Sequence, residues 1–319
     1  MTRVTKEVGN MYTDVIIGFD GSPSGRDALA LGRRLAEVAG AAITVVCVHA
    51  YMALTADVEA DGAVELSWRE GAERTLDEAR GLLSGVPAAT FRAMAETSPA
   101  RALHLAADEA DAALIVLGST HRHGLGRALP GTTADQVLHA APCAIAVAPA
   151  GYAASDQAER LGVVGAAVDA GEETERVARV GARIARGAKA RLRLISVIER
   201  HYTQGPLYTG NLGYRSLHVA MTSLTEEALQ RGAAAAGGDV DVETRLSEGA
   251  PAEQLIAESH DLDLLVVGSR GFGPLRRVVL GTVGAAVVRA AACPVLILPR
   301  RTAEQLDDAV ASLAEAAAT

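Results

Sequence analysis

Aromatic residues make up only 3% of the 319-residue sequence, although 49% of its residues are hydrophobic. The core must therefore be built from Ala, Val, Leu and Ile, which favours helices packed on a buried sheet. The length suits two domains of ordinary size. The formal net charge of −9 argues against non-specific binding to nucleic acid or to an anionic membrane surface.

Cysteines are few and isolated from one another. Cys47, Cys143 and Cys293 form no CxxC pair, so neither a zinc site nor a disulfide framework is indicated. Cys143 and Cys293 occupy equivalent places at the start of an apolar stretch, and we interpret them as small core residues rather than redox groups. No apolar run approaches the length of a membrane span, and residues 1–14 contain no signal-peptide-like segment. We therefore expect a cytoplasmic protein with no membrane partner.

The usual catalytic motifs are also missing. The sequence contains no G-x-S-x-G elbow, no HExxH and no Ser–His–Asp set that can be recognised from spacing. The segment THRHG at 120–124 supplies at most two metal ligands, so a solvated basic loop is the better interpretation. We predict no catalytic residue and no metal site, and we expect a binding protein rather than an enzyme.

An internal repeat is the most informative feature of the chain. Residues 113–149 and 263–299 align without a gap, with Gly118 matching Gly268 (268 − 118 = 150). The segments 14–49 and 162–198 also resemble each other. We predict two domains, 11–150 (copy one) and 161–300 (copy two), a linker at 150–162 and a helical tail at 301–319.

Each copy alternates short apolar segments with segments of helical spacing. The apolar segments are rich in Val, Ile and Ala, as expected for strands buried on both faces of a parallel sheet. In copy one we predict strands at 14–19, 42–49, 88–95, 113–117 and 143–148. The fold class is therefore α/β, with two tandem doubly wound five-stranded parallel sheets. Ligands bind such sheets at the carboxyl ends of the strands.

A glycine-rich loop follows the fourth predicted strand of copy two. Glycines occur at 268, 271, 273 and 281, with Thr282 directly after the last of them. Glycine is needed where the backbone takes positive φ or lies close to another group. A helix that begins at Thr282 offers N–H groups and a partial positive charge to an anion. A tight turn with incidental glycines is the alternative, but the combination favours a phosphate cradle.

The spacing G268-x2-G271-x9-G281-T282 resembles the ATP-binding signature of the universal stress protein family. GFDGS at 18–22 and ACPVLILP at 292–299 also fit that family, and the resemblance covers nearly the whole chain. It implies two tandem universal stress domains with the related adenine-nucleotide alpha-hydrolase-like fold, ATP as cofactor, with or without Mg²⁺, and a nucleotide-dependent role in stress regulation. It also implies an intramolecular pseudo-dimer in which the last strands, 143–148 and 295–298, meet. A further homodimer stays open, and neither the sequence nor the resemblance identifies a protein partner.

The resemblance also implies a set of nucleotide-binding residues in each copy. The Asp after the first strand would hydrogen-bond the adenosine, a Val near the end of the second strand would line the adenine pocket, and the glycine loop would hold ribose and phosphates. In copy two these residues are Asp169, Val197, Gly268, Arg270, Gly271, Gly281, Thr282 and Val283. In copy one they are Asp20, Val48, Gly118, Gly131, Thr132 and Thr133. The loop has no Walker lysine for the outer phosphates.

Each copy departs from the family pattern at one end. In copy one His121 replaces the second signature glycine, so a side chain stands where the backbone should meet phosphate. In copy two Glu172, Glu173 and Glu175 follow Asp169. These carboxylates either face the triphosphate and oppose it unless a divalent cation intervenes, or lie in the first turn of a helix and favour its dipole. We favour the second alternative, and copy two is the better candidate for binding ATP.

Two other functions remain open. One is an interaction scaffold that binds no nucleotide. His121 in copy one and the glutamates after Asp169 in copy two support this alternative. The other is a slow metal-dependent ATPase or adenylating enzyme of the related α/β superfamily. The sequence does not distinguish ATP from AMP or a cyclic nucleotide.

Overall fold

The structure is a computed structural model of the whole chain. It describes residues 14–50, 58–86, 89–119, 132–138, 141–171, 173–199, 211–269 and 281–299. The tail predicted at 301–319 lies outside these residues.

Copy one alternates strands and helices from its start to its end. Its elements are β1 (Val15–Gly18), α1 (Pro23–Ala39), β2 (Ile43–His49), α2 (Val58–Leu82), β3 (Ala89–Ala95), α3 (Pro99–Ala110), β4 (Leu114–Gly118), α4 (Thr132–Leu138) and β5 (Ala144–Ala148). The five predicted strands agree with β1 to β5 within one residue at each end. The apolar pattern is therefore sufficient to locate the buried strands.

Copy two repeats this order. Its elements are β6 (Val163–Ala167), α5 (Thr174–Ala188), β7 (Arg191–Glu199), α6 (Asn211–Ala236), β8 (Val242–Gly249), α7 (Pro251–Glu258), the 3-10 turn η4 (Ser259–Asp261), β9 (Leu264–Gly268), α8 (Thr282–Ala290) and β10 (Val295–Leu298). Two further 3-10 turns, η1 (Tyr152–Ala154) and η2 (Asp156–Ala158), lie between the copies.

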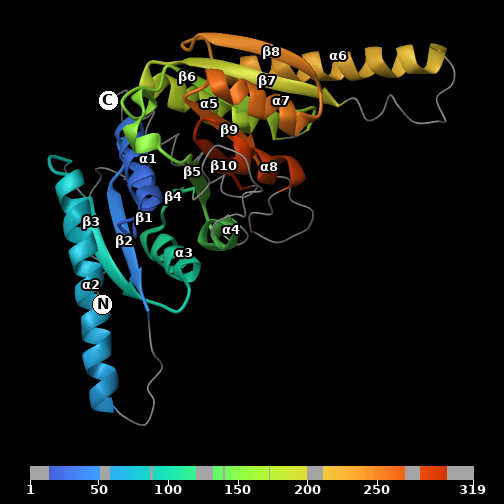
Figure 1. The fold of residues 1–319 in the computed structure, drawn as a ribbon. Coiled ribbons are helices and arrows are strands. Elements are labelled where there is room, and N and C mark those ends of the chain that lie inside the picture. Colours follow the sequence, from blue (N-terminus) through green and yellow to red (C-terminus); the bar gives the residue numbers. More distant parts are fainter. Residues whose placement is uncertain are drawn as a thin grey trace, which may run out of the picture.

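The two copies share one ten-stranded sheet with the order β3-β2-β1-β4-β5-β10-β9-β6-β7-β8. All neighbours are parallel except β5 and β10, which pair antiparallel with Ile145 opposite Ile297. Figure 1 shows the two halves of the sheet meeting at this pair. The predicted pairing of the last strands is confirmed. It protects two strand edges that would otherwise be open.

Helices cover both faces of the sheet and enclose two cores. One core contains side chains from α1, α2, α5 and α6, and the other contains side chains from α3, α4, α7 and α8. Alternate residues of each strand face opposite cores, as Ile16 and Ile17 do in β1. This explains why the strands are apolar at successive positions rather than at every second one.

The segment predicted as a linker is packed and hydrogen-bonded to both copies. Buried Asp27 in α1 accepts hydrogen bonds from the backbone N–H groups of Gly151 and Ala153, both at 2.8 Å. Asp263, which precedes β9, accepts from the N–H of Gly162 at 2.7 Å. Tyr152 is only 1% exposed. The linker therefore holds the two copies in one arrangement.

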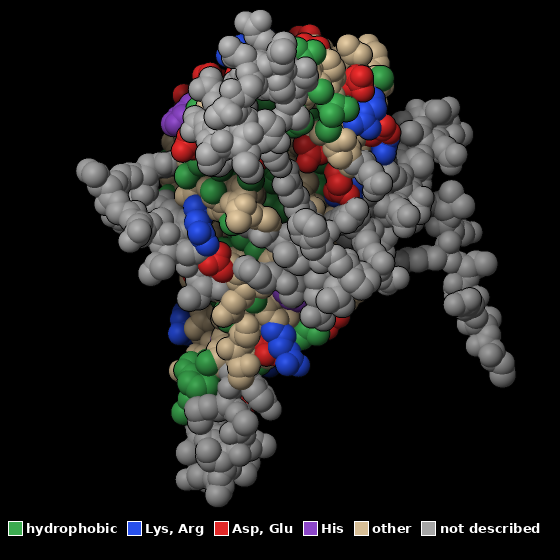
Figure 2. All heavy atoms as spheres, turned by 90° about the vertical axis from the view of Figure 1, so that its right-hand side faces the viewer, with side chains coloured by type: hydrophobic (Ala, Val, Ile, Leu, Met, Phe, Trp, Pro, Cys, Tyr) green, Lys and Arg blue, Asp and Glu red, His purple; other side chains and the backbone are tan. Residues whose placement is uncertain are grey.

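Charges of both signs are mixed on the described part of the face that Figure 2 draws. On the face drawn in Figure 2, acidic and basic side chains lie side by side and do not separate into patches of one sign. Within the described ranges, no helix combines the length and the apolar character that crossing a bilayer requires.

Candidate nucleotide site

A cavity of about 160 Å³ opens at the carboxyl ends of β6, β7 and β9 in copy two. This is where a doubly wound sheet is expected to bind its ligand. The cavity is lined by Ala167, Val168, Asp169, Glu173, Thr174, Val177, Ile195, Val197, Pro251, Leu255, Val267, Gly268, Ser269, Gly281, Thr282, Val283, Gly284 and Val287.

The structure brings together most of the residues predicted for copy two. These are Asp169, Val197, Gly268, Gly281, Thr282 and Val283, which come from β7, the end of β9, the start of α8 and the loop after β6. Arg270 and Gly271 lie outside the described residues. Residues that are separated by more than a hundred positions in the sequence thus line the same cavity.

Helix α8 points its N-terminus into this cavity. Its N-cap residue, Gly281, has no side chain to cap the first turn, and no side-chain cap bond is made there. The backbone of Gly281 has φ −67° and ψ 166°, a conformation that any residue can adopt. Glycine is therefore not required here for backbone freedom, and a side chain at this position would lie next to the first N–H groups of α8.

Much of the cavity lining is apolar. Ile195 and Val197 contribute from β7, Val177 from α5, and Leu255 from α7. Ligand pockets commonly pair such an apolar surface with a few polar groups that fix orientation. An apolar surface next to a helix N-terminus suits a ligand with a flat uncharged part and an anionic part.

Asp169 lies at the rim with its carboxylate exposed. One carboxylate oxygen accepts a hydrogen bond from the N–H of Gly171 at 2.9 Å, and the hydroxyl of buried Thr174 donates to the Asp169 carbonyl. These bonds fix the turn between β6 and α5. They leave the side chain of Asp169 at a position where it can meet a ligand.

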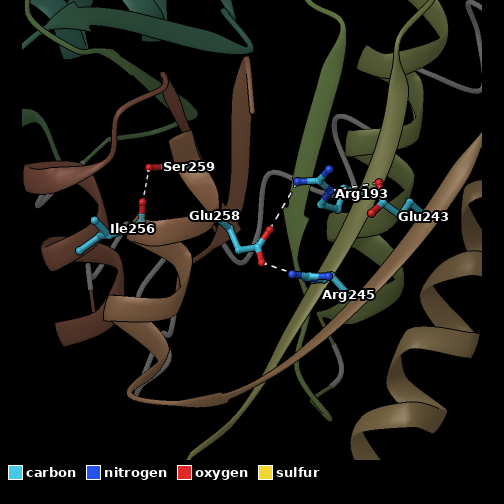
Figure 3. A network of polar contacts seen from close by, with 6 residues as sticks. All are labelled: Arg193, Glu243, Arg245, Ile256, Glu258 and Ser259. Carbon is cyan, nitrogen blue, oxygen red and sulfur yellow. Dashed lines mark hydrogen bonds and ion pairs between the residues drawn. The ribbon is translucent and has the colours of Figure 1, made fainter. Parts of the chain in front are cut away.

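Helix α7 forms another wall of the cavity and is tied to the sheet by an ion-pair network. Glu258 at its end lies 3.1 Å from Arg245 and 3.4 Å from Arg193, and Arg193 also pairs with Glu243 at 3.1 Å. Figure 3 shows Glu258 reaching between the two arginines of β7 and β8. The hydroxyl of Ser259 donates to the carbonyl of Ile256 and accepts from the N–H of Ala292. The network thus positions the helix that carries Pro251 and Leu255 into the cavity.

The glutamates after Asp169 have different environments. Glu175 lies in the first turn of α5 and faces Arg179 and Arg231, each 3.9 Å away, as the dipole interpretation expects. Glu173 instead lines the cavity next to Gly268. Glu173 is the N-cap residue of α5, so it lies at the positive end of the helix dipole and also lines the cavity, and both alternatives apply to it in part. Glu172 lies outside the described residues.

In copy one the corresponding strand ends are arranged differently. A Cβ on Gly118 would lie 1.8 Å from the backbone oxygen of Ser24, so the first turn of α1 packs directly on the end of β4. Asp20 accepts hydrogen bonds from the N–H of Ser22 at 3.0 Å and from its hydroxyl. Val48 and Thr133 are partly buried. Gly131 and the side chain of Thr132 lie outside the described part of the chain.

All three cysteines are buried, which agrees with the interpretation of Cys143 and Cys293 as core residues. Burial raises the pKa of Cys143 to about 12. Burial, with a smaller contribution from the charge of Asp20, raises the pKa of Cys47 to about 11. Such thiols stay protonated and unreactive at neutral pH. Among the residues that the structure describes, no group of three or more His, Cys, Asp or Glu side chains could hold a metal ion.

Several cavity residues escaped the analysis of the sequence. Thr174, Val177, Leu255 and Val287 occupy ordinary positions on helices, and nothing in their spacing distinguishes them from core residues. Pro251 had a signal, because Gly249 precedes it by two residues and takes φ 145°. A glycine with positive φ at the last position of a strand marks a turn that brings the next helix over the strand end.

Taken together, the sheet order and the cavity at the strand ends define a doubly wound α/β protein with a small-molecule pocket. The chain belongs to the universal stress protein family, whose family model matches residues 11–149 and 162–299. A universal stress protein of Mycobacterium tuberculosis is 26% identical over 292 residues, which are 89% of this chain and 99% of the relative.

Two further similarities cover different shares of the chain. A putative universal stress protein of Staphylococcus aureus is 32% identical over 121 residues, which are 36% of this chain and 70% of the relative. The crystal structure of a universal stress protein from Archaeoglobus fulgidus has a TM-score of 0.64 and 19% identity, and covers 91% of this chain and 100% of its own. That likeness extends the shared fold over both copies.

Proposed function

We propose that this protein binds an adenine nucleotide in copy two, with ATP as the ligand, and acts as a nucleotide-dependent regulator of the stress response. The observation that carries the proposal is the cavity at the strand ends, which is lined both by a helix N-terminus without a side-chain cap and by apolar residues of β7. The helix end suits phosphate, and Val197 with Ile195 suits the flat adenine ring.

The residues around the cavity favour regulation over turnover. Apart from Asp169 and Glu173, no acid, base or thiol is among its lining residues in the described part of the chain. A bound nucleotide contacts α5, α7 and α8 together, so its presence would shift the equilibrium between arrangements of these helices. We place this regulator in the cytoplasm, which stays a prediction.

The test is a calorimetric titration of ATP with Mg²⁺ into the full chain and into Gly281→Val. The valine side chain would occupy the space next to the first N–H groups of α8 while keeping an allowed backbone conformation. We expect at least about a tenfold loss of affinity, and an unchanged melting temperature within about 3 °C.

The matched control is Gly131→Val, which changes the equivalent glycine of copy one. If the site lies in copy two, this variant keeps the affinity of the unchanged protein. Normal binding by Gly281→Val would place the ligand elsewhere. Absence of binding by the unchanged protein would favour the alternative of a scaffold that works without nucleotide.

A further inference from the structure

A carboxylate forms part of the cavity wall at its phosphate end. Glu173 lines the cavity, and its Oε2 lies 3.5 Å from the position that a Cβ on Gly268 would take. The side chain is 27% exposed. A phosphate held by the backbone at Gly268 would therefore lie close to a negative charge.

Arg176 fixes the orientation of this carboxylate. Its guanidinium is 2.7 Å from Oε2 of Glu173 and 3.2 Å from Oε1, and one of its nitrogens donates to the carbonyl of Leu298 at 3.4 Å. The Arg176 side chain is only 8% exposed and is not among the lining residues of the cavity. Both carboxylate oxygens therefore contact the guanidinium and Oε2 itself is buried, so only the remaining part of the carboxylate borders the cavity and Arg176 balances part of its charge.

Copy one has no charge at the equivalent place. Ser24 corresponds to Glu173 (173 − 24 = 149, the same offset that relates Asp169 to Asp20). The hydroxyl of Ser24 lies 2.9 Å from that of Ser22. The carboxylate is therefore a specific feature of copy two and not a requirement of the fold.

We propose that Glu173 is a specificity-determining residue, which makes copy two select its ligand by charge. Like charges within a few ångströms disfavour each other in a partly buried site. The pocket therefore prefers adenosine to AMP and AMP to ATP when no divalent cation is present. A divalent cation between the carboxylate and the phosphates removes this discrimination. The inference rests on the proposed function, because it assumes that adenine compounds occupy this cavity.

The test measures dissociation constants for adenosine, AMP and ATP by calorimetry, first in EDTA and then with Mg²⁺. The variants are Glu173→Gln, which removes the charge and keeps the shape, and Glu173→Ser, which introduces the residue of copy one. In EDTA we expect the ratio of the ATP to the adenosine dissociation constant to fall about tenfold or more in both variants. Addition of Mg²⁺ should produce a similar fall in the unchanged protein.

Two controls separate this effect from others. Glu175→Gln removes a carboxylate that faces Arg179 and Arg231 instead of the cavity, and it should leave the ratio unchanged. The double variant Glu173→Gln/Arg176→Met removes both charges of the pair. If the ratio still falls, the lost carboxylate causes the change, and not a guanidinium released towards the phosphate.

The outcomes are distinct. A ratio in Glu173→Gln within about twofold of that of the unchanged protein would overturn the charge selection while leaving the proposed function intact. A fall in the ratio that disappears in the double variant would also overturn it. Failure of every variant and of the unchanged protein to bind adenosine, AMP or ATP, with or without Mg²⁺, would contradict the proposed function, and the inference with it.

Discussion

The two copies have the same strand order, but the ends of β4 and β9 contact different atoms. In copy one the backbone oxygen of Ser24 lies against Gly118, where a Cβ would be 1.8 Å away. In copy two the nearest atoms to a Cβ on Gly268 belong to the side chains of Val177 and Glu173, at 3.4 and 3.5 Å. The same glycine therefore allows close helix packing in one copy and borders a cavity in the other.

The cause lies in how the following helix begins. In copy one Ser22 accepts from the N–H of Gly25 at 3.1 Å and Pro23 occupies the first turn, a combination that starts a helix well. Copy two has Gly171 in place of Ser22, and α5 begins only at Thr174, the residue that corresponds to Gly25. Two fewer helical residues leave the space above Gly268 open.

The largest expected effect comes from adding one methyl group to each of these glycines. Gly118→Ala would place a Cβ inside the contact distance of a backbone atom, so we expect a loss of about 3 kcal/mol in the free energy of unfolding. Gly268→Ala meets only ordinary van der Waals contacts and should cost less than about 1 kcal/mol. Urea denaturation of both variants measures the difference. Equal losses would show that the two strand ends are not packed differently.

A second comparison concerns the ion pairs between the edge strands and the helices that follow them. Arg92 in β3 and Arg245 in β8 occupy the same register, opposite Val46 and Ile195. Arg92 pairs with Glu109, whose side chain is 56% exposed, whereas Arg245 pairs with Glu258, which is 13% exposed and also contacts Arg193.

We therefore expect Glu258→Gln to cost more than Glu109→Gln. The first change weakens two charged contacts in a partly buried place and should destabilise by about 2 kcal/mol. The second affects one exposed pair and should cost about 0.5 kcal/mol. Denaturation in low salt measures both losses. A larger loss in Glu109→Gln would contradict the view that the network of Figure 3 holds α7 in place.

The smallest expected effect concerns Cys47, because copy two has a serine at the equivalent position. Cys47 in β2 corresponds to Ser196 in β7, whose hydroxyl donates to the carbonyl of Val168 at 2.8 Å. Because the pKa of Cys47 is raised to about 11, the folded chain keeps this proton at a pH where the unfolded chain has lost it. Stability is therefore complete below the unfolded pKa and falls as the pH rises from about 9 towards 11.

Cys47→Ser should remove this contribution and make copy one resemble copy two. Between pH 9 and 10.5 its free energy of unfolding should fall less steeply than that of the unchanged protein, by about 1 kcal/mol per pH unit at most. Urea denaturation at several pH values gives both slopes. Parallel slopes would mean that the folded state does not hold the Cys47 proton.

Much of this arrangement follows from the sequence because it depends on repeated, local signals. The gapless match of Gly118 with Gly268 reveals the duplication, and the apolar runs locate the strands. The pairing of β5 with β10 follows from the resemblance to the family. The inward turn of Glu173 does not follow, because it depends on where α5 starts relative to Gly268. The contacts of Glu258 depend on how β7 and β8 align with each other and with α7. No short segment of sequence predicts that alignment.

The central claim is that copy two holds one adenine nucleotide. Mass spectrometry of the small molecules released from the purified, heat-denatured full chain tests it most directly, after incubation with ATP and Mg²⁺ and removal of the free ligand. We predict about one adenine nucleotide per chain, and a loss of most of it in Gly281→Val. A chain that releases no nucleotide, or that releases as much from Gly281→Val as from the unchanged protein, would contradict the claim.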